Sequence, residues 1–98
     1  CPDLRNTKVV DIVKELKEYS MNFDIVDPWC SNDQALVEHG LSLTKTPQKG
    51  QYDAIILAVA HDEFKRMGAD EIRALGKEDC VLYDLKSLLP KDKVDMRL

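Results

Sequence analysis

The feature that most constrains the fold is an unbroken apolar run from Ala54 to Ala60, which follows Asp53 and ends at His61. A strand that is apolar on both sides of its pleat is typical of a parallel sheet covered by helices on both faces. The run is far shorter than the roughly 20 residues that span a bilayer, which argues against a transmembrane chain. We therefore predict a central parallel strand over residues 53–60.

The other apolar patterns alternate between helical and strand spacing. Asn6 and Thr7 are good N-cap residues for an amphipathic helix that ends near Tyr19-Ser20. In chain order, the further predicted elements are a strand over 21–26, a helix over 32–39, a brief strand over 41–43, a helix from 62 broken at Gly68 and continued over 69–75, and a strand over 80–83 ended by Asp84. A polar tail over 87–98 follows, with Leu88, Leu89, Val94 and Met96 as possible anchors.

This alternation predicts an α/β fold: a Rossmann-like three-layer sandwich with a mainly parallel sheet and right-handed crossovers. The 98 residues provide room for a single domain, 1–98. No strand precedes the first helix, because residues 1–5 do not read as one, so the first strand is expected to be truncated. The chain begins with Cys1-Pro2 and without Met, and we expect it to be a piece of a longer protein.

Charge and cysteine content exclude several classes of function. The formal net charge is -4 and the isoelectric point about 5.1, which argues against a nucleic-acid partner. The three cysteines are Cys1, Cys30 and Cys80, an odd and widely spaced set that predicts neither a disulfide framework nor a metal site. We read them as reduced thiols of a cytoplasmic protein.

Ligands of open parallel sheets bind beyond the carboxyl ends of the strands. Four segments are expected to meet there: residues 3–7, 27–29, 61–62 and 84–86. Arg5 at a helix start and Lys86 after a strand would suit a diphosphate. The alternative, which the residue pattern alone favours, is that Arg5 pairs with Asp3 and that Lys86 is simply solvated.

Two further residues at this edge allow a functional or a structural reading. His61 could bind a ligand or transfer a proton, or it could only terminate the strand. Trp29 could stack on a ring, or it could pack at the surface. The sequence contains no GxGxxG turn, so the chain is not expected to hold NAD by itself, and no catalytic motif is found within it.

Four motifs occur in a characteristic order: Asp3-Leu4-Arg5-Asn6-Thr7, which fits D-x-R-x-[ST]; Val26-Asp27-Pro28; Tyr52 to His61, followed by Glu63-Phe64; and Tyr83-Asp84-Leu85-Lys86. Together they resemble the C-terminal, UDP-binding domain of the UDP-glucose/GDP-mannose dehydrogenase family. The resemblance is closest to the bacterial members that oxidise UDP-N-acetylgalactosamine or UDP-N-acetylglucosamine for polysaccharide synthesis.

The resemblance implies a place in an NAD-dependent enzyme that oxidises the sugar C6 alcohol to a carboxylate. It implies that NAD is held mainly by an N-terminal domain, with Arg5 on the cofactor side. Lys86 would contact the diphosphate of the UDP-sugar substrate, with Thr7 and His61 also on the substrate side. The family's catalytic Cys lies in a glycine-rich motif that this chain lacks, so no residue here is predicted to be catalytic.

The family also has a Phe-Lys pair upstream of the D-x-R motif, which is absent here. The isolated domain is therefore expected to be an inactive monomer, and the full-length enzyme a homodimer. Two other classes of function remain open. One is a standalone α/β regulatory or partner-binding module, and the other is a purely structural interaction domain that responds to no nucleotide.

Overall fold

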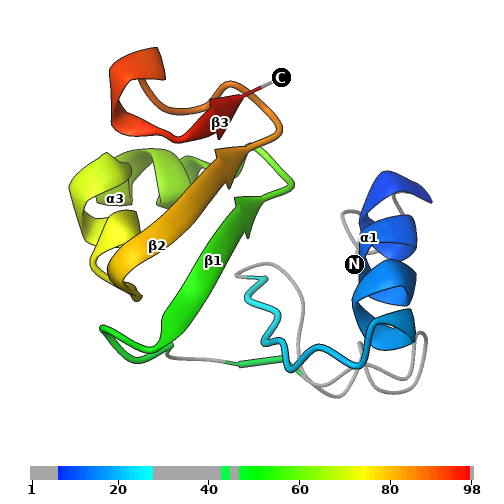
Figure 1. The fold of residues 1–98 in the computed structure, drawn as a ribbon. Coiled ribbons are helices and arrows are strands. Elements are labelled where there is room, and N and C mark those ends of the chain that lie inside the picture. Colours follow the sequence, from blue (N-terminus) through cyan, green and yellow to red (C-terminus); the bar gives the residue numbers. More distant parts are fainter. Residues whose placement is uncertain (1–6, 28–42, 45–46, 98) are drawn as a thin grey trace. The chain divides into compact units, whose positions relative to one another are not determined.

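The structure is a computed structural model, and it describes residues 7–27, 43–44 and 47–97. The chain divides into two compact units, Cys1–Pro47 and Gln48–Leu98, and each unit is described by itself. Figure 1 shows α1 (Thr7–Glu18) in the described part of the first unit, and a sheet with α3 (Asp62–Arg73) in the second unit.

The first unit contains α1, which spans Thr7–Glu18 as the sequence predicts. Its apolar residues recur at helical spacing, and Val13 among them is buried. The helix ends in a Schellman motif: the Met21 N–H donates to the Leu16 carbonyl, and the Ser20 N–H donates to the Lys17 carbonyl, both at 3.0 Å. Ser20 has a left-handed φ of 55°, the conformation that reverses the chain direction after the helix.

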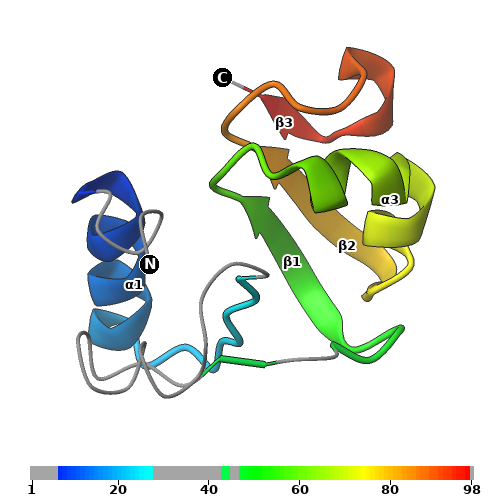
Figure 2. The same ribbon diagram turned by 180° about the vertical axis from the view of Figure 1, so that it is seen from behind.

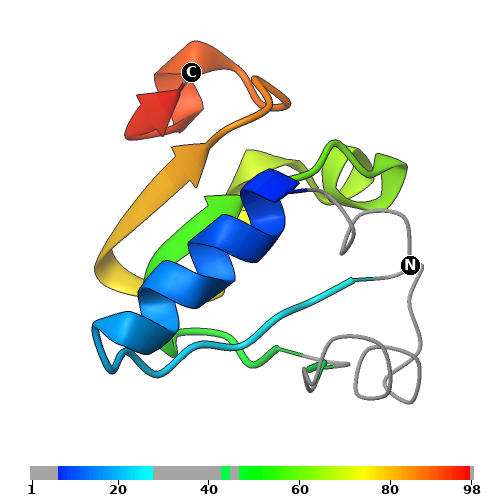
Figure 3. The same cartoon turned by 90° about the vertical axis from the view of Figure 1, so that its right-hand side faces the viewer.

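The strand predicted over residues 21–26 is wrong. Within the described residues, the segment forms a single parallel bridge between Ile25 and Leu43, supported by a 2.7 Å bond from the Thr44 N–H to the Ile25 carbonyl. The reason is that its first positions, Met21 and Asn22, are exposed, so no continuous apolar face drives pairing. Figure 3 shows this extended segment turning back along α1. The predicted helix over 32–39 lies outside the described residues.

The second unit is a three-stranded parallel sheet in the order β1-β2-β3. The strands and helices in chain order are β1 (Tyr52–Leu57), α3 (Asp62–Arg73), β2 (Gly76–Asp84), the 3-10 helix η2 (Lys91–Lys93) and β3 (Met96–Arg97). β1 ends three residues before the predicted boundary at Ala60. Parallel strands joined through a helix confirm the small Rossmann-like α/β fold.

The core of this unit lies between the sheet and α3, which Figure 2 shows in front of β2. Its buried cluster consists of Leu57, Ile72, Leu82 and Leu89. Leu57 of β1 and Leu82 of β2 lie on the sheet face that packs against α3. On the opposite face, Ile56 is 43 % exposed and Val81 39 % exposed. Within this unit the helix therefore covers one face, whereas the sequence pattern predicts cover on both.

α3 is interrupted at Gly68, as the sequence predicts. Gly68 has φ 77° and ψ 168°, which is a non-helical conformation inside the segment. A left-handed φ is accessible to glycine without a steric penalty, so the helix can kink here and continue to Arg73. The second stretch carries Ile72 into the core.

β2 begins at Gly76, four residues before the predicted start at Cys80. The register moves from Tyr52 opposite Gly76 to Ala54 opposite Val81, so β2 bulges where β1 is regular. The bulge brings Gly76 against Cys80. A Cβ added at position 76 would lie 2.2 Å from the Cys80 Sγ, so the backbone approaches this closely because residue 76 has no side chain.

Three of the four anchors predicted for the polar tail over 87–98 pack on the core: Leu89 is buried in the cluster, and Leu88 and Val94 lie against it. Met96 is 50% exposed and lies in β3, a strand that the sequence did not predict and that pairs with β2.

The Asp95 N–H donates to the Leu82 carbonyl at 3.0 Å, and the Asp95 Oδ2 accepts from the Leu82 N–H at 2.7 Å. Arg73 completes the arrangement by donating to Asp95 Oδ2 at 3.2 Å and to the Lys93 carbonyl at 2.9 Å. We call these contacts the Arg73–Asp95 clasp. It holds α3, β2 and the start of β3 together, which apolar patterning alone does not reveal.

Candidate functional site

The carboxyl ends of β1 and β2 form one edge of the sheet in the second unit. Leu57 pairs with Asp84 in register, and the Leu85 N–H donates to the Leu57 carbonyl at 3.0 Å. After β1 the chain leads to His61, and after β2 it leads to Lys86. Two of the four predicted site segments therefore start from this carboxyl edge.

Lys86 lies in a loop over residues 84–89 that is built around a buried carboxylate. Asp84, the last residue of β2, is 0 % exposed. Its Oδ1 accepts from the Lys86 N–H at 3.1 Å, and its Oδ2 accepts from the Leu89 N–H at 2.8 Å. The Lys86 side chain is exposed, so its ammonium can reach an anionic ligand at the carboxyl edge.

His61 is the N-cap residue of α3, and the residue is only 6 % exposed. Its carbonyl accepts from the N–H groups of Phe64 and Lys65, at 3.1 and 3.2 Å, and its ring meets the Phe64 ring edge-on at 5.6 Å. These contacts fit the structural reading of His61, as the residue that leads from β1 into α3. A role in substrate binding stays a prediction.

The two helix starts differ in charge. The first turn of α3 carries Asp62 and Glu63, whose carboxylates oppose the binding of an anion there. The first turn of α1 carries no acidic residue. The helix start that the sequence assigns to a diphosphate, next to Arg5, is thus the more suitable of the two.

The predicted residues of the first unit are only partly described. Arg5 lies outside the described residues. Thr7 is the first residue of α1, and its side chain is not described. The structure therefore brings together the segments that contain His61 and Lys86, and it describes no contact for Arg5 or Thr7.

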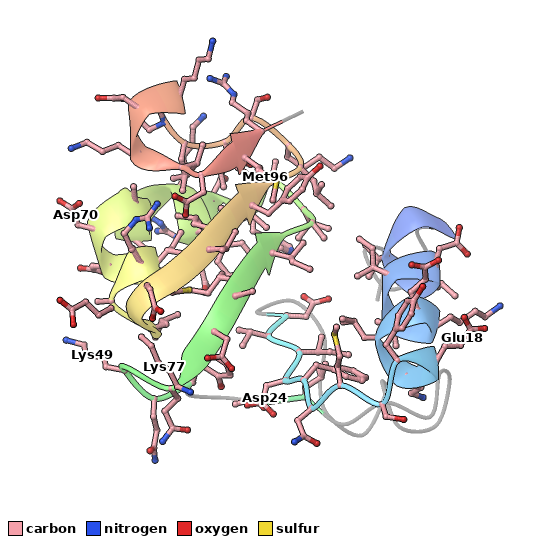
Figure 4. The ribbon with its side chains drawn as sticks, in the orientation of Figure 1. Glu18, Asp24, Lys49, Asp70, Lys77 and Met96 are labelled. Atoms are coloured by element: carbon pink, nitrogen blue, oxygen red, sulfur yellow. The ribbon has the colours of Figure 1, made fainter. Side chains whose placement is uncertain are left out.

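The sequence pattern missed the role of one residue at the carboxyl edge and the presence of another. Asp84 lies in the predicted segment 84–86, but its hydrogen bonds to the loop N–H groups were not predicted, although an Asp two residues before a loop N–H is a common turn former. Arg97 lies in register with Asp84 at the end of β3 and is exposed, which adds a second cation to this edge. In contrast, Figure 4 shows Lys49 and Lys77 at the opposite end of the sheet, where the strands begin.

The described residues do not fit a dinucleotide. β1 is followed by Ala58-Val59-Ala60 rather than by a glycine-rich turn, and the helix after it starts with acidic residues. Among the described side chains, no group of three or more His, Cys, Asp or Glu could hold a metal ion. In the part of the chain that the structure covers, every helix is too short or too polar to cross a bilayer.

Cys80 is a free, buried thiol, and its burial raises its pKa above the ordinary value. A nucleophilic cysteine needs a lowered pKa and access to substrate. The environment of Cys80 is therefore that of a packing residue.

Comparison with known proteins links this fold to one family. The sequence profile of the UDP-glucose/GDP-mannose dehydrogenase family, UDP binding domain, matches residues 1–91. No solved structure gave a significant match.

Three curated proteins are similar to the chain. A UDP-N-acetyl-D-glucosamine 6-dehydrogenase of Pseudomonas aeruginosa is 62% identical over 98 residues, and one of Salmonella typhi is 48% identical over 98 residues. Both alignments cover 100% of this chain and 23% of the relative. Protein CapL of Staphylococcus aureus is 34% identical over 97 residues, which are 98% of this chain and 22% of that protein. The chain thus spans about a quarter of the length of these relatives.

Proposed function

Because the chain belongs to the UDP-glucose/GDP-mannose dehydrogenase family, whose UDP-binding domain it matches, we propose that it is the UDP-sugar-binding lobe of a nucleotide-sugar 6-dehydrogenase. The full-length protein would oxidise the C6 alcohol of the sugar to a carboxylate. The observation that carries this proposal is the exposed Lys86 on a loop held by buried hydrogen bonds at the carboxyl edge. An ammonium at this edge neutralises the charge of a diphosphate.

The substrate that we propose is UDP-N-acetyl-D-glucosamine, with UDP-N-acetyl-D-galactosamine as the second candidate. Two relatives with 62% and 48% identity carry the first sugar nucleotide in their names. Lys86, Thr7 and His61 would lie on the substrate side and Arg5 on the cofactor side.

NAD would be held by other parts of the full-length protein, since the described residues do not fit a dinucleotide. When bound, it accepts hydride from the sugar. The role of this lobe is then electrostatic: it binds and orients the diphosphate, and it contributes no catalytic residue. The 98 residues alone are expected to show no dehydrogenase activity. Homodimer assembly, a role in polysaccharide synthesis and a cytoplasmic location stay predictions from the family resemblance.

The proposal is tested by assaying the full-length protein for NADH formation with UDP-N-acetyl-D-glucosamine, UDP-N-acetyl-D-galactosamine and UDP-glucose. We expect activity with an N-acetylated sugar nucleotide, and two NADH for each sugar oxidised. Lys86→Ala is expected to raise the KM for the sugar nucleotide by about 10- to 100-fold, the effect of one charge-assisted hydrogen bond. Lys49→Ala, which removes the same charge at the opposite end of the sheet, is the matched control and should leave KM unchanged.

Two results would contradict the proposal. An unchanged KM in Lys86→Ala would remove Lys86 from diphosphate binding. Absence of NADH formation with all three sugar nucleotides, together with no UDP binding, would favour the standalone regulatory or partner-binding module.

A further inference from the structure

The loop over residues 84–89 is fixed at both ends by buried groups. The loop starts at Asp84, which is 0 % exposed. It ends at Leu89, which is 4 % exposed and belongs to the core cluster. The Asp84 carboxylate joins these ends, because its Oδ1 accepts a hydrogen bond from the Lys86 N–H and its Oδ2 accepts one from the Leu89 N–H. Between the fixed ends, Lys86 and Ser87 are exposed.

The loop conformation needs this support. Ser87 has φ 53°, the left-handed region that residues other than glycine enter only at a cost. Such a conformation persists where surrounding contacts hold it. Here the two hydrogen bonds to Asp84 enclose the strained residue, one before it and one after it.

A fixed loop changes how Lys86 can bind an anion. If the backbone of residue 86 moved freely, ligand binding would have to order the loop and would lose affinity by that cost. With the Lys86 N–H already bonded to Asp84, only the side-chain rotamers remain to be ordered.

We propose that Asp84 is a positioning residue for Lys86: its buried carboxylate holds the loop in the conformation that presents the Lys86 ammonium to the diphosphate of the substrate. This inference rests on the proposed function, in which Lys86 contacts that diphosphate. Asp84 itself is not accessible to a ligand, because its side chain is fully buried.

The test is a double-mutant cycle in the full-length protein, with KM and kcat measured for UDP-N-acetyl-D-glucosamine. The variants are Lys86→Ala, Asp84→Asn and the double variant. Asn can accept one of the two N–H bonds through its single carbonyl oxygen, but its amide group would face the other N–H as a second donor. Asp84→Asn should therefore loosen the loop while retaining part of its support.

We expect Asp84→Asn to raise KM about fivefold, with kcat within about twofold of the parent value. On the Lys86→Ala background, Asp84→Asn should raise KM by less than about twofold, since no ammonium remains to be positioned. Asp95→Asn is the matched control, because its carboxylate also accepts a β2 N–H, that of Leu82, but lies outside the loop. Its KM should equal that of the parent.

If the rise of KM in the double variant equalled the product of the rises in Asp84→Asn and Lys86→Ala, the two residues would act independently. This result would overturn the inference while leaving the proposed function intact. An equal rise of KM in Asp84→Asn and Asp95→Asn would also overturn it, because general destabilisation would then explain the effect. An unchanged KM in Lys86→Ala alone would contradict the proposed function, and the inference with it. Should Asp84→Asn fail to fold, Asp84→Ser, whose hydroxyl can accept one N–H, takes its place with the same expectations.

Discussion

Two aspartates, one at the end of β2 and one directly before β3, hold backbone N–H groups by different means. Asp84 is fully buried, and its carboxylate accepts two backbone N–H groups from the loop that directly follows it. Asp95 has a side chain that is 44% exposed, and it accepts one backbone N–H from Leu82 and pairs with Arg73 at 3.2 Å. The first shapes a local loop, whereas the second joins segments that are distant in sequence.

The difference indicates which contacts water can replace. If the Asp84 carboxylate is removed, the buried N–H of Leu89 loses its acceptor, and a buried unpaired donor carries its full desolvation cost. If the Asp95 carboxylate is removed, the Leu82 N–H also loses its acceptor, but that hydrogen bond is only partly buried. Water can enter at the position of Asp95, which is 44% exposed, and can reach Arg73, which is 38% exposed. We therefore expect burial, more than formal charge, to determine the stabilising effect of each aspartate.

The largest expected effect is that of Asp84→Ala. Loss of both acceptors should lower the free energy of unfolding by about 3 kcal/mol. Urea denaturation followed by circular dichroism measures this change. A loss no larger than that of Asp95→Ala would break the comparison.

Asp95→Ala should destabilise the protein less than Asp84→Ala, and its effect should be confined to the clasp. Hydrogen exchange of the Leu82 amide, which donates to Asp95 Oδ2, is expected to become faster, while that of Leu89 stays unchanged. Equal acceleration at both amides would show that the clasp and the loop form one cooperative unit.

The clasp should also make stability depend on pH. The hydrogen bond from the Leu82 N–H, and then Arg73, hold the pKa of Asp95 below its ordinary value. A lowered folded-state pKa stabilises the protein above the pKa of the unfolded chain, about 3.9, and this stabilisation is lost as the pH falls through the folded-state pKa. Asp95→Asn should therefore show a weaker loss of stability between pH 5 and pH 2 than the parent, measured by urea denaturation at each pH. The same acid slope in both proteins would contradict the lowered pKa.

The smallest effect is expected at a third aspartate, Asp53, whose described ion-pair partner is Lys77 at 3.0 Å. Both side chains are exposed, at 87% and 53% respectively. Lys77→Met should change the free energy of unfolding by less than about 0.5 kcal/mol, as is usual for surface ion pairs. A larger loss would show that exposure is a poor guide to the effect of these carboxylates.

The sequence predicted those elements that periodicity or a strong breaker defines. The helix ending at Tyr19-Ser20, the strand within 53–60 and the interruption at Gly68 are confirmed. Apolar content alone was misleading over residues 21–26, where one bridge forms instead of a strand. Lys86 was identified by its distance from the end of a strand, and the structure confirms that it is exposed after β2.

Tertiary hydrogen bonds could not be predicted in this way. Directly before β3, Asp95 accepts from the N–H of Leu82 and donates to its carbonyl, a long-range contact that no local pattern predicts. The two-residue strand β3 itself has no periodicity to detect. Likewise, the support that Asp84 gives to the loop depends on its burial, which no local pattern reveals.

The close approach of Gly76 to Cys80 has a consequence for how this sequence can vary. A Cβ at position 76 would overlap both the Sγ and the Cβ of Cys80, at 2.2 and 2.4 Å, and would lie 3.2 Å from the Tyr52 carbonyl oxygen. The two positions thus compete for the same space at the bulge, and a residue with a side chain fits at 76 only if the side chain at 80 is smaller or shifts away. We therefore expect that folded variants from a library randomised at both positions carry a side chain at 76 only together with a substitution at 80.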